Sequence, residues 1–193
     1  EGSMLTETFL HVPGIGLKRE RDLWDEGTLT WWQAFEDHSH ALVTPLSGPL
    51  QRVLKESLRE LQEGCFEMTA SILDKSQHWR ALCFRLRDAE NPVPLRWLAL
   101  DIETTGLSAE SAQTTVVGLC GHATGFKPVA LVADEPDWAR ELTRYLVQSD
   151  VLITFNGRKF DVPFLAADLA GMPLIFPPFH VDIYLLMRAL GQR

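Results

Sequence analysis

Several features that would narrow the function at once are scarce in this sequence. It has three cysteines, Cys65, Cys83 and Cys120, which are far apart and odd in number, so they form neither a disulfide framework nor a CxxC metal pair. No run approaches the roughly 18 apolar residues of a membrane-spanning helix, and no signal-peptide pattern follows Met4. These absences argue against a disulfide-stapled secreted domain and against a membrane protein, and we expect a reducing cytoplasm as the setting.

An excess of basic residues is also lacking. The formal net charge is −8; the first 94 residues hold 10 basic and 15 acidic residues, and the remaining 99 hold 8 and 11. Neither half has the composition of a basic nucleic-acid-binding domain, which argues against strong passive binding to a phosphate backbone. A site at which bound metal ions supply the positive charge stays open, because such ions can dominate the local electrostatics.

The length and composition of the chain fit a globular protein with two parts. Its 193 residues suffice for one ordinary domain and a smaller one, and 46% of them are hydrophobic. Residues 1–4, Glu-Gly-Ser-Met, look like a cloning remnant before a natural start at Met4. Asn91-Pro92 and Pro94 mark a boundary, after which the residue pattern changes from helical to mixed strand and helix. We therefore predict a helical region over residues 5–92 and an α/β domain over residues 93–193.

Helical spacing of apolar residues marks the first region. The strongest predicted helix covers residues 48–63, where leucine and valine recur at three- and four-residue intervals and Gly64 supplies a stop. Shorter helices are predicted from Arg19 to Asp25 and around Trp31, and a further helix over residues 76–86 would have Ser76 as its N-cap.

The second region alternates between strand and helix patterns. Strands are predicted over residues 95–102, 114–123, 126–134 and 150–156, with a hairpin between the second and third because Gly121 and Gly125 separate them. Helices are predicted over residues 136–149 and 159–172, and residues 179–190 begin as a short strand and continue as a helix. The predicted order is β-β-β-α-β-α-β-α.

Two acids end the first predicted strand, in the stretch LALDIETTGL. Asp101 and Glu103 share one side of the strand because side chains alternate, and the apolar run before them predicts a central strand that is covered on both faces. Paired carboxylates there are costly unless a shared proton, a basic partner or a divalent cation compensates. The alternative is a strand that runs out into solvent, where acids and turn residues are common.

A second pair of polar residues follows the strand at 150–156. Asn156 lies at its end, and Asp161 lies in the opening turn of the next helix, where the helix dipole favours an acid. Each has a purely structural explanation, since Asn is also a common turn residue. If the two strands are neighbours, however, Asp161 can face Asp101 and Glu103 across one crevice at the carboxyl ends of the strands.

These motifs resemble those of a known superfamily. Asp101-Ile-Glu103-Thr-Thr-Gly resembles the first motif of the DEDD superfamily of 3′–5′ exonucleases, of the proofreading type, and Asn156-Gly-Arg-Lys-Phe-Asp161 resembles the second. The residues of both motifs, together with His-Val-Asp-Ile-Tyr from residue 180, are most similar to those of a bacterial family of ribonuclease H-like exonuclease domains. The resemblance is strong over about residues 93–193, and it implies an α/β, ribonuclease H-like mixed sheet.

The resemblance implies phosphodiester hydrolysis of DNA or RNA with two Mg²⁺ or Mn²⁺ ions. Asp101, Glu103 and Asp161 would be the metal ligands and catalytic acids, acting at the 3′ end of a single-stranded nucleic acid. Residues near the substrate would be those after the first motif and around the second: Thr104, Thr105, Gly106, Leu107, Asn156, Arg158 and Lys159. For Arg158 and Lys159 singly, solvated residues at a helix start are the alternative. The choice between DNA and RNA stays open.

The sequence departs from this superfamily in one respect. The superfamily has a fourth carboxylate, in a third motif with Tyr or His a few residues before Asp, and no such motif occurs before Arg193. Asp182 lacks the expected spacing, so we interpret it as an acid near the crevice rim or at a strand end, with substitution as a ligand as the lesser alternative. His180 is expected to be structural. The domain is therefore expected to be C-terminally incomplete, with uncertain activity of its own.

Two further alternatives concern the whole chain. Residues 9–36, with Pro13-Gly-Ile-Gly16, resemble a helix-hairpin-helix unit whose backbone N–H groups could contact a phosphate, and a helical subdomain with a tryptophan core explains them equally well. For the α/β domain, the competitors to an exonuclease are a nucleic-acid-binding or scaffolding module on an inactive ribonuclease H-like fold, and a structural domain with unpaired surface acids.

Overall fold

The computed structural model describes residues 5–36, 48–83, 95–172 and 174–191. The chain divides into two compact units, Glu1–Pro94 and Leu95–Arg193, and each is described by itself. The predicted cloning remnant at residues 1–4 and the predicted boundary at Asn91-Pro92 and Pro94 lie outside the described residues. Within the described part, no helix is both long and apolar enough to cross a membrane.

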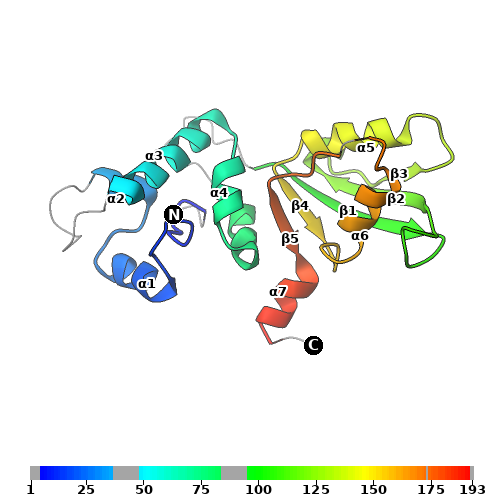
Figure 1. The fold of residues 1–193 in the computed structure, drawn as a ribbon. Helices are drawn as coiled ribbons and strands as arrows, with labels where there is room; N and C mark the ends of the chain where they lie inside the picture. The colour runs from blue at the N-terminus through cyan, green and yellow to red at the C-terminus, as the bar shows by residue number, and fades with distance from the viewer. Residues whose placement is uncertain (1–4, 37–47, 84–94, 173, 192–193) are drawn as a thin grey trace. The chain divides into compact units, whose positions relative to one another are not determined.

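Four α-helices and one 3₁₀ helix make up the described part of the first unit (Figure 1). They are α1 (Leu17–Asp25), α2 (Trp31–Glu36), α3 (Gly48–Glu63), α4 (Glu67–Ile72) and the 3₁₀ helix η1 (Lys75–Cys83). The predicted helix over residues 48–63 is confirmed: its apolar residues Leu54 and Leu61 are buried. The chain leaves this helix through Gly64, which has a φ of 68° that favours glycine.

Two features of this unit differ from the prediction. Helix α4 was not predicted, because six residues are too short for a clear apolar period; Glu60 of α3 supplies its cap by accepting hydrogen bonds from the backbone N–H groups of Met68 (2.6 Å) and Thr69 (2.9 Å). The predicted α-helix over residues 76–86 is a 3₁₀ helix as far as Cys83, and Ser76 is not its N-cap. Asp74 has that role and accepts hydrogen bonds from the Ser76 backbone (2.8 Å) and hydroxyl (2.5 Å).

The tryptophans of the first unit are structural. Trp31 has no exposed surface, and its indole N–H donates to the Thr8 carbonyl at 2.6 Å. Trp24 donates in the same way to the Glu7 carbonyl at 2.9 Å. These contacts fit the helical-subdomain interpretation of residues 9–36.

The second unit is a five-stranded mixed sheet with helices (Figure 1). Its elements are β1 (Trp97–Thr104), β2 (Thr114–Gly121), the 3₁₀ turn η2 (His122–Thr124), β3 (Val129–Val132), α5 (Trp138–Val147), β4 (Val151–Thr154), α6 (Asp161–Asp168), β5 (Phe179–Asp182) and α7 (Ile183–Ala189). The strand order is β3-β2-β1-β4-β5, with β1–β2 and β2–β3 antiparallel and β1–β4 and β4–β5 parallel. The predicted element order and the hairpin are confirmed.

The two faces of this sheet differ. Leu98, Leu100 and Ile102 of β1 are buried in a core to which α5 contributes Leu142 and Leu146, and α6 contributes Phe164 and Leu165. The intervening residues of β1 point to the opposite face, and among them Asp101 and Glu103 are exposed. The prediction that β1 is covered on both faces was therefore wrong for the described residues, because α5 and α6 both pack on the leucine face.

Candidate functional site

Asp101 and Glu103 lie at the carboxyl end of β1, as predicted. Both are exposed, and the residue between them, Ile102, faces the core with 7% of its surface exposed. The parallel pairing of β1 with β4 ends at Ala99, so the last residues of β1 extend past β4 and leave a gap at this edge of the sheet. A carboxylate from another element can enter the gap there.

Asp161 occupies that gap from the first turn of α6. Only 3% of its surface is exposed, and its carboxylate accepts a hydrogen bond from the Ile102 N–H at 3.1 Å. Burial raises the pKa of this carboxyl, and the negative charges of Asp101 and Asp182 raise it further, although hydrogen bonds from backbone N–H groups partly oppose them. The structure thus brings Asp101 and Asp161 together, as the motif order predicted.

Asp182 has a role that the sequence interpretation missed. It ends β5 with 5% of its surface exposed, and its carboxylate accepts hydrogen bonds from the backbone N–H groups of Asn156 (2.8 Å), Arg158 (3.1 Å) and Tyr184 (3.1 Å). It therefore joins the turn after β4 to the start of α7. A strand-end acid two residues before a helical N–H is the pattern of an N-cap, and this signal was present in the sequence.

The turn that Asp182 holds has little room for other residues. Asn156 has a φ of 61°, a left-handed conformation that Asn tolerates better than most residues. A Cβ on Gly157 would meet the side chain of Thr154 at 2.5 Å, so only glycine fits there without a shift of the strand end. The Asn-Gly pair of the second motif is therefore required by the path of the backbone, whatever else it does.

The predicted substrate residues after β1 form a turn with internal hydrogen bonds. The Thr104 hydroxyl donates to the Gly106 carbonyl at 2.6 Å, and Thr105 exchanges hydrogen bonds with the backbone of Gln113 at 2.9 and 3.0 Å. Leu107 is 90% exposed at the tip. An exposed leucine on a closed turn beside the acids is available for contact, whereas the threonine hydroxyls are already engaged.

The two predicted basic residues after β4, Arg158 and Lys159, also differ in whether their side chains are engaged within the protein. The Arg158 guanidinium donates to the carbonyl of His180, so this side chain is bound to β5, whereas Lys159 is exposed. His180 is structural, as expected, with its Nε2 2.8 Å from the Thr154 hydroxyl. Of the two basic residues, Lys159 alone has an exposed side chain.

Carboxylate oxygens are suitable ligands for Mg²⁺ or Mn²⁺, and the donor chemistry of these acids fits such ions. Their positions, however, do not form a complete ligand set. Within the described ranges, no group of three or more His, Cys, Asp or Glu side chains is placed to hold a metal ion. The Asp182 carboxylate accepts hydrogen bonds from three backbone N–H groups. The described acids therefore do not by themselves make a metal centre.

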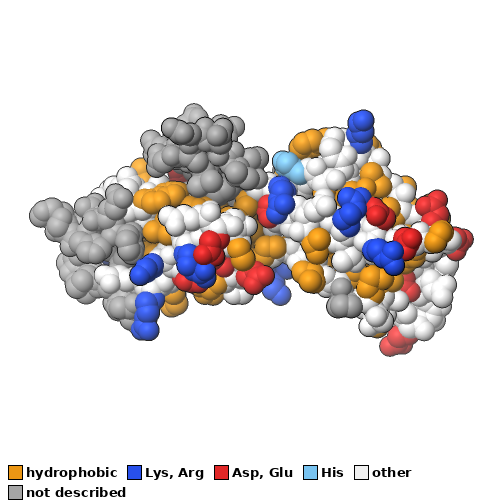
Figure 2. Space-filling view, turned by 90° about the horizontal axis from the view of Figure 1, so that it is seen from above, with side chains coloured by type: hydrophobic (Ala, Val, Ile, Leu, Met, Phe, Trp, Pro, Cys, Tyr) orange, Lys and Arg blue, Asp and Glu red, His pale blue; other side chains and the backbone are white. Residues whose placement is uncertain are grey.

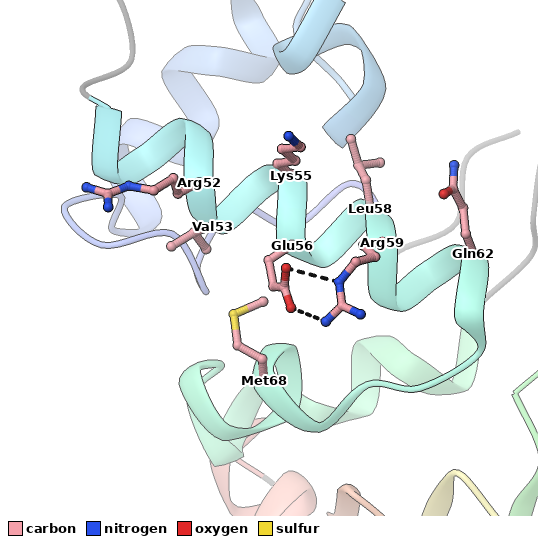
Figure 3. A pocket seen from close by; sticks show the side chains of 8 residues that line it. All are labelled: Arg52, Val53, Lys55, Glu56, Leu58, Arg59, Gln62 and Met68. Carbon is pink, nitrogen blue, oxygen red and sulfur yellow. Dashed lines mark hydrogen bonds and ion pairs between the residues drawn. The ribbon is translucent and has the colours of Figure 1, made fainter.

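The described surface includes a hollow in each unit. The first, of about 750 Å³, lies along α3 above Met68 of α4, and within it Arg59 is hydrogen-bonded to Glu56 (Figure 3). The second, of about 790 Å³, lies in the second unit and is lined partly by Asp101. On the face shown in Figure 2, basic and acidic side chains are interspersed with hydrophobic ones and form no single basic field among the described residues. The candidate site is thus the acidic edge of the sheet and the hollow beside it.

One comparison with known proteins, with a protein-family model, agrees with the fold. Residues 98–192 match a family model described as the RNase_H superfamily, and no curated protein matches the chain. A similar solved structure is the family B DNA polymerase from the hyperthermophilic archaeon Pyrobaculum calidifontis, at 19% identity and a TM-score of 0.40, covering 50% of this chain and 16% of that chain. With its mixed sheet in the order 3-2-1-4-5 and the match to this family model, the α/β unit has a ribonuclease H-like fold.

Proposed function

We propose that the α/β domain belongs to a metal-dependent 3′–5′ exonuclease that hydrolyses phosphodiester bonds of DNA or RNA. One observation carries the proposal: the buried carboxylate of Asp161 is hydrogen-bonded to the N–H of Ile102, between Asp101 and Glu103. Because burial and neighbouring acids raise the pKa of Asp161, its ionised carboxylate weakens the fold at neutral pH. Such an arrangement is typical of functional sites.

The residues of the chain would divide the work as follows. Asp101, Glu103 and Asp161 are the proposed catalytic acids and the proposed ligands of Mg²⁺ or Mn²⁺, although the described acids do not close a ligand set. Asp182 is a positioning residue, because it fixes the turn that leads from β4 into α6. Lys159 and Leu107, both exposed, are the proposed contacts to a phosphate and to the terminal nucleotide.

The test is hydrolysis of 5′-labelled single-stranded DNA and RNA by the full chain, with Mg²⁺ or Mn²⁺. Stepwise shortening from the 3′ end supports the proposal, and Asp101→Asn and Asp161→Asn should each abolish it. Glu141→Gln, which changes an exposed acid on α5, is the matched control and should leave the rate unchanged. Shortening that persists in both aspartate variants would show that the activity comes from elsewhere.

A second function is favoured by the incomplete ligand set. A nucleic-acid-binding module without hydrolysis needs the fold and the exposed contacts but no closed metal site. Calorimetric titration with Mn²⁺ separates the two: the exonuclease requires saturable binding that Asp161→Asn weakens. Oligonucleotide binding without Mn²⁺ binding and without hydrolysis would establish the binding module instead.

A further inference from the structure

The regular pairing of β1 with β2 is broken beside Glu103. Glu103 pairs with Val116 and Thr104 pairs with Thr114, so Thr115 is an extra residue on β2 and forms a β-bulge. The burial pattern shows the same break: Thr114 is buried, the next two residues are partly exposed, and strict alternation begins only at Val116. Bulges bend a strand and re-aim its side chains, and they are common next to active sites.

The end of β1 depends on β2 for its position. Parallel pairing with β4 stops at Ala99, so of the described strands only β2 accompanies the residues that follow. Asp161 adds one hydrogen bond, which its carboxylate accepts from the Ile102 N–H at 3.1 Å. From the bulge itself, the Thr115 hydroxyl donates to the Glu103 carbonyl at 3.0 Å. Contacts that fix the bulged segment of β2 therefore also fix Glu103.

Asp168 fixes this segment from α6. Its carboxylate accepts a hydrogen bond from the Thr114 backbone N–H at 2.9 Å, immediately before the bulge. Asp161 and Asp168 are seven residues apart, which is nearly two helical turns, so they lie on the same side of α6. The first accepts from β1, at Ile102, and the second accepts from β2. Helix α6 is thus bonded through two carboxylates to both strands of the pair that contains Glu103.

The place of Asp168 in its helix is unfavourable for an acid. It is the last residue of α6, and the last four residues, Leu-Ala-Ala-Asp, include no basic one. The partial negative charge at a helix C-terminus disfavours a carboxylate, and lysine or arginine would be the stabilising choice there. The contact with β2 accounts for an acid at this position.

We propose that Asp168 is a positioning residue for the acidic edge: through Thr114 and the bulge, it sets where the Glu103 carboxylate lies relative to Asp161. This inference rests on the proposed function, in which Glu103 and Asp161 act together. Asp168 acts through the backbone, because it is bonded to β2 from the helix, whereas Glu103 is exposed on the opposite face of the sheet. A displacement of about 1 Å from a change far from the chemistry can cost roughly 100-fold in rate.

Two variants at position 168 separate the hydrogen-bond acceptor from the charge. Asp168→Ala removes the acceptor of the Thr114 N–H, whereas Asp168→Asn keeps a carbonyl oxygen there and removes the charge. Asp150→Ala is the matched control. Asp150 is also a partly exposed acid that accepts a hydrogen bond from a backbone N–H, that of Arg96 at 2.7 Å, but it does so at the opposite end of β1.

The first measurement does not depend on activity. Amide hydrogen exchange of the full chain is followed residue by residue by NMR. In Asp168→Ala, the protected amides among residues 102–105 and 114–116 should exchange roughly tenfold faster, while residues 97–99 keep their protection. Asp168→Asn should match the wild type throughout. In Asp150→Ala, the loss of protection should fall on residues 96–99 instead.

The second measurement is hydrolysis of the 5′-labelled single strand with Mg²⁺, analysed as kcat and KM. Asp168→Ala should lower kcat by roughly tenfold or more. It should change KM less, because the exposed contacts Lys159 and Leu107 are retained. Asp168→Asn should restore kcat, and Asp150→Ala should leave both constants near those of the wild type.

The outcomes keep this inference apart from the exonuclease proposal. Faster exchange confined to the acidic edge, with a lower kcat that Asp168→Asn restores, supports it. Unchanged exchange at the edge, faster exchange across the whole α/β unit, or a wild-type kcat in Asp168→Ala overturns it. If the wild type hydrolyses neither DNA nor RNA, the exonuclease proposal fails, and the exchange comparison still decides whether Asp168 holds the Glu103 segment.

Discussion

Two buried acids, Glu20 in the helical unit and Asp161 in the α/β unit, have opposite surroundings. In the helical unit, Glu20 is 1% exposed, and its carboxylate accepts hydrogen bonds from the Thr8 hydroxyl (2.7 Å), the Phe9 N–H (2.8 Å) and the Arg80 guanidinium (3.3 Å). In the α/β unit, Asp161 has one backbone partner outside its own helix and two acidic neighbours that raise its pKa. The partners of Glu20 compensate its charge, so this acid is structural. The ionised Asp161 carboxylate instead lowers the stability of the fold, which favours a functional role for the sheet edge where it lies.

The largest expected loss of stability follows from removing Glu20, the buried acid whose hydrogen bonds are all made. Glu20→Ala removes the partner of a buried guanidinium, so we expect the helical unit to lose about 3–5 kcal/mol of stability. Hydrogen exchange should then show lost protection in residues 5–36 and retained protection in the α/β unit. Glu20→Met combined with Arg80→Met is the control and should cost less, because no charge is left unpaired. A single-variant loss below about 1 kcal/mol would contradict the contrast between the two acids.

The next effect is an acid-sensitive histidine in the same unit. His11 has no exposed surface, its ring lies 4.8 Å from that of Trp31, and burial lowers its pKa from 6.5 to about 4. Because the unfolded chain binds the proton more tightly, stability is fully present above pH 6.5 and falls as the pH drops toward 4. The loss should reach about 3 kcal/mol.

Urea unfolding of the helical unit between pH 7 and pH 4 measures this loss. His11→Leu should remove most of the pH dependence in this window, since it leaves no ionisable side chain at this buried position. If His11→Leu and the wild type lost stability in parallel, another group would be responsible for the acid sensitivity.

A smaller effect is expected at the turn beside the candidate site. Asp182→Ala leaves three backbone N–H groups without their acceptor, which should cost about 2 kcal/mol. Asp182→Asn keeps one carbonyl oxygen and should cost less. Urea unfolding of the α/β unit measures both. If Asp182→Ala matched the wild type, the carboxylate would not hold the turn that leads from β4 into α6.

Replacement of Asp161, whose pKa is raised, should increase the stability of the α/β unit. The pKa of Asp161 is raised, so the folded state holds its proton more tightly than the unfolded chain, and the ionised form weakens the fold as the pH rises above the ordinary value of 3.8. Asp161→Asn keeps an oxygen for the Ile102 N–H and should raise the melting temperature at pH 7, with no gain below pH 3.8.

Asp168→Asn is the matched control for this gain. Asp168 lies on the same helix and accepts a hydrogen bond from the Thr114 N–H at 2.9 Å, so we expect no stabilisation from its replacement. Differential scanning at pH 7 and at pH 3 makes the comparison. If Asp161→Asn were less stable than the wild type at pH 7, the acid would be structural, and the case for a functional edge would weaken.

The element order and the acidic edge could be predicted because their signals are local. Alternation along residues 97–104 places Asp101 and Glu103 on one side, and the spacing from Asn156 to Asp161 places an acid at a helix start. What could not be predicted depends on partners remote in sequence. Helix α4 is capped by Glu60, and the open sheet face follows from α5 and α6 packing on the same side. Asp182 could be predicted in part. Its role as the N-cap of α7 depends on neighbouring residues in the sequence, whereas its contacts to Asn156 and Arg158 depend on residues far from it in the sequence.

The smallest effect is expected where charges are paired but exposed. On α3, the hydrogen bonds that Arg59 donates to Glu56 and Glu63 raise the pKa of its guanidinium, yet the three side chains are each about half exposed. Water and salt screen such pairs, and the flexible side chains lose entropy in forming them. Arg59→Ala should therefore leave the melting temperature unchanged within error, at low and at high salt. A loss comparable to that of Glu20→Ala would show that the number of partners, rather than burial, decides how much an ion pair stabilises this protein.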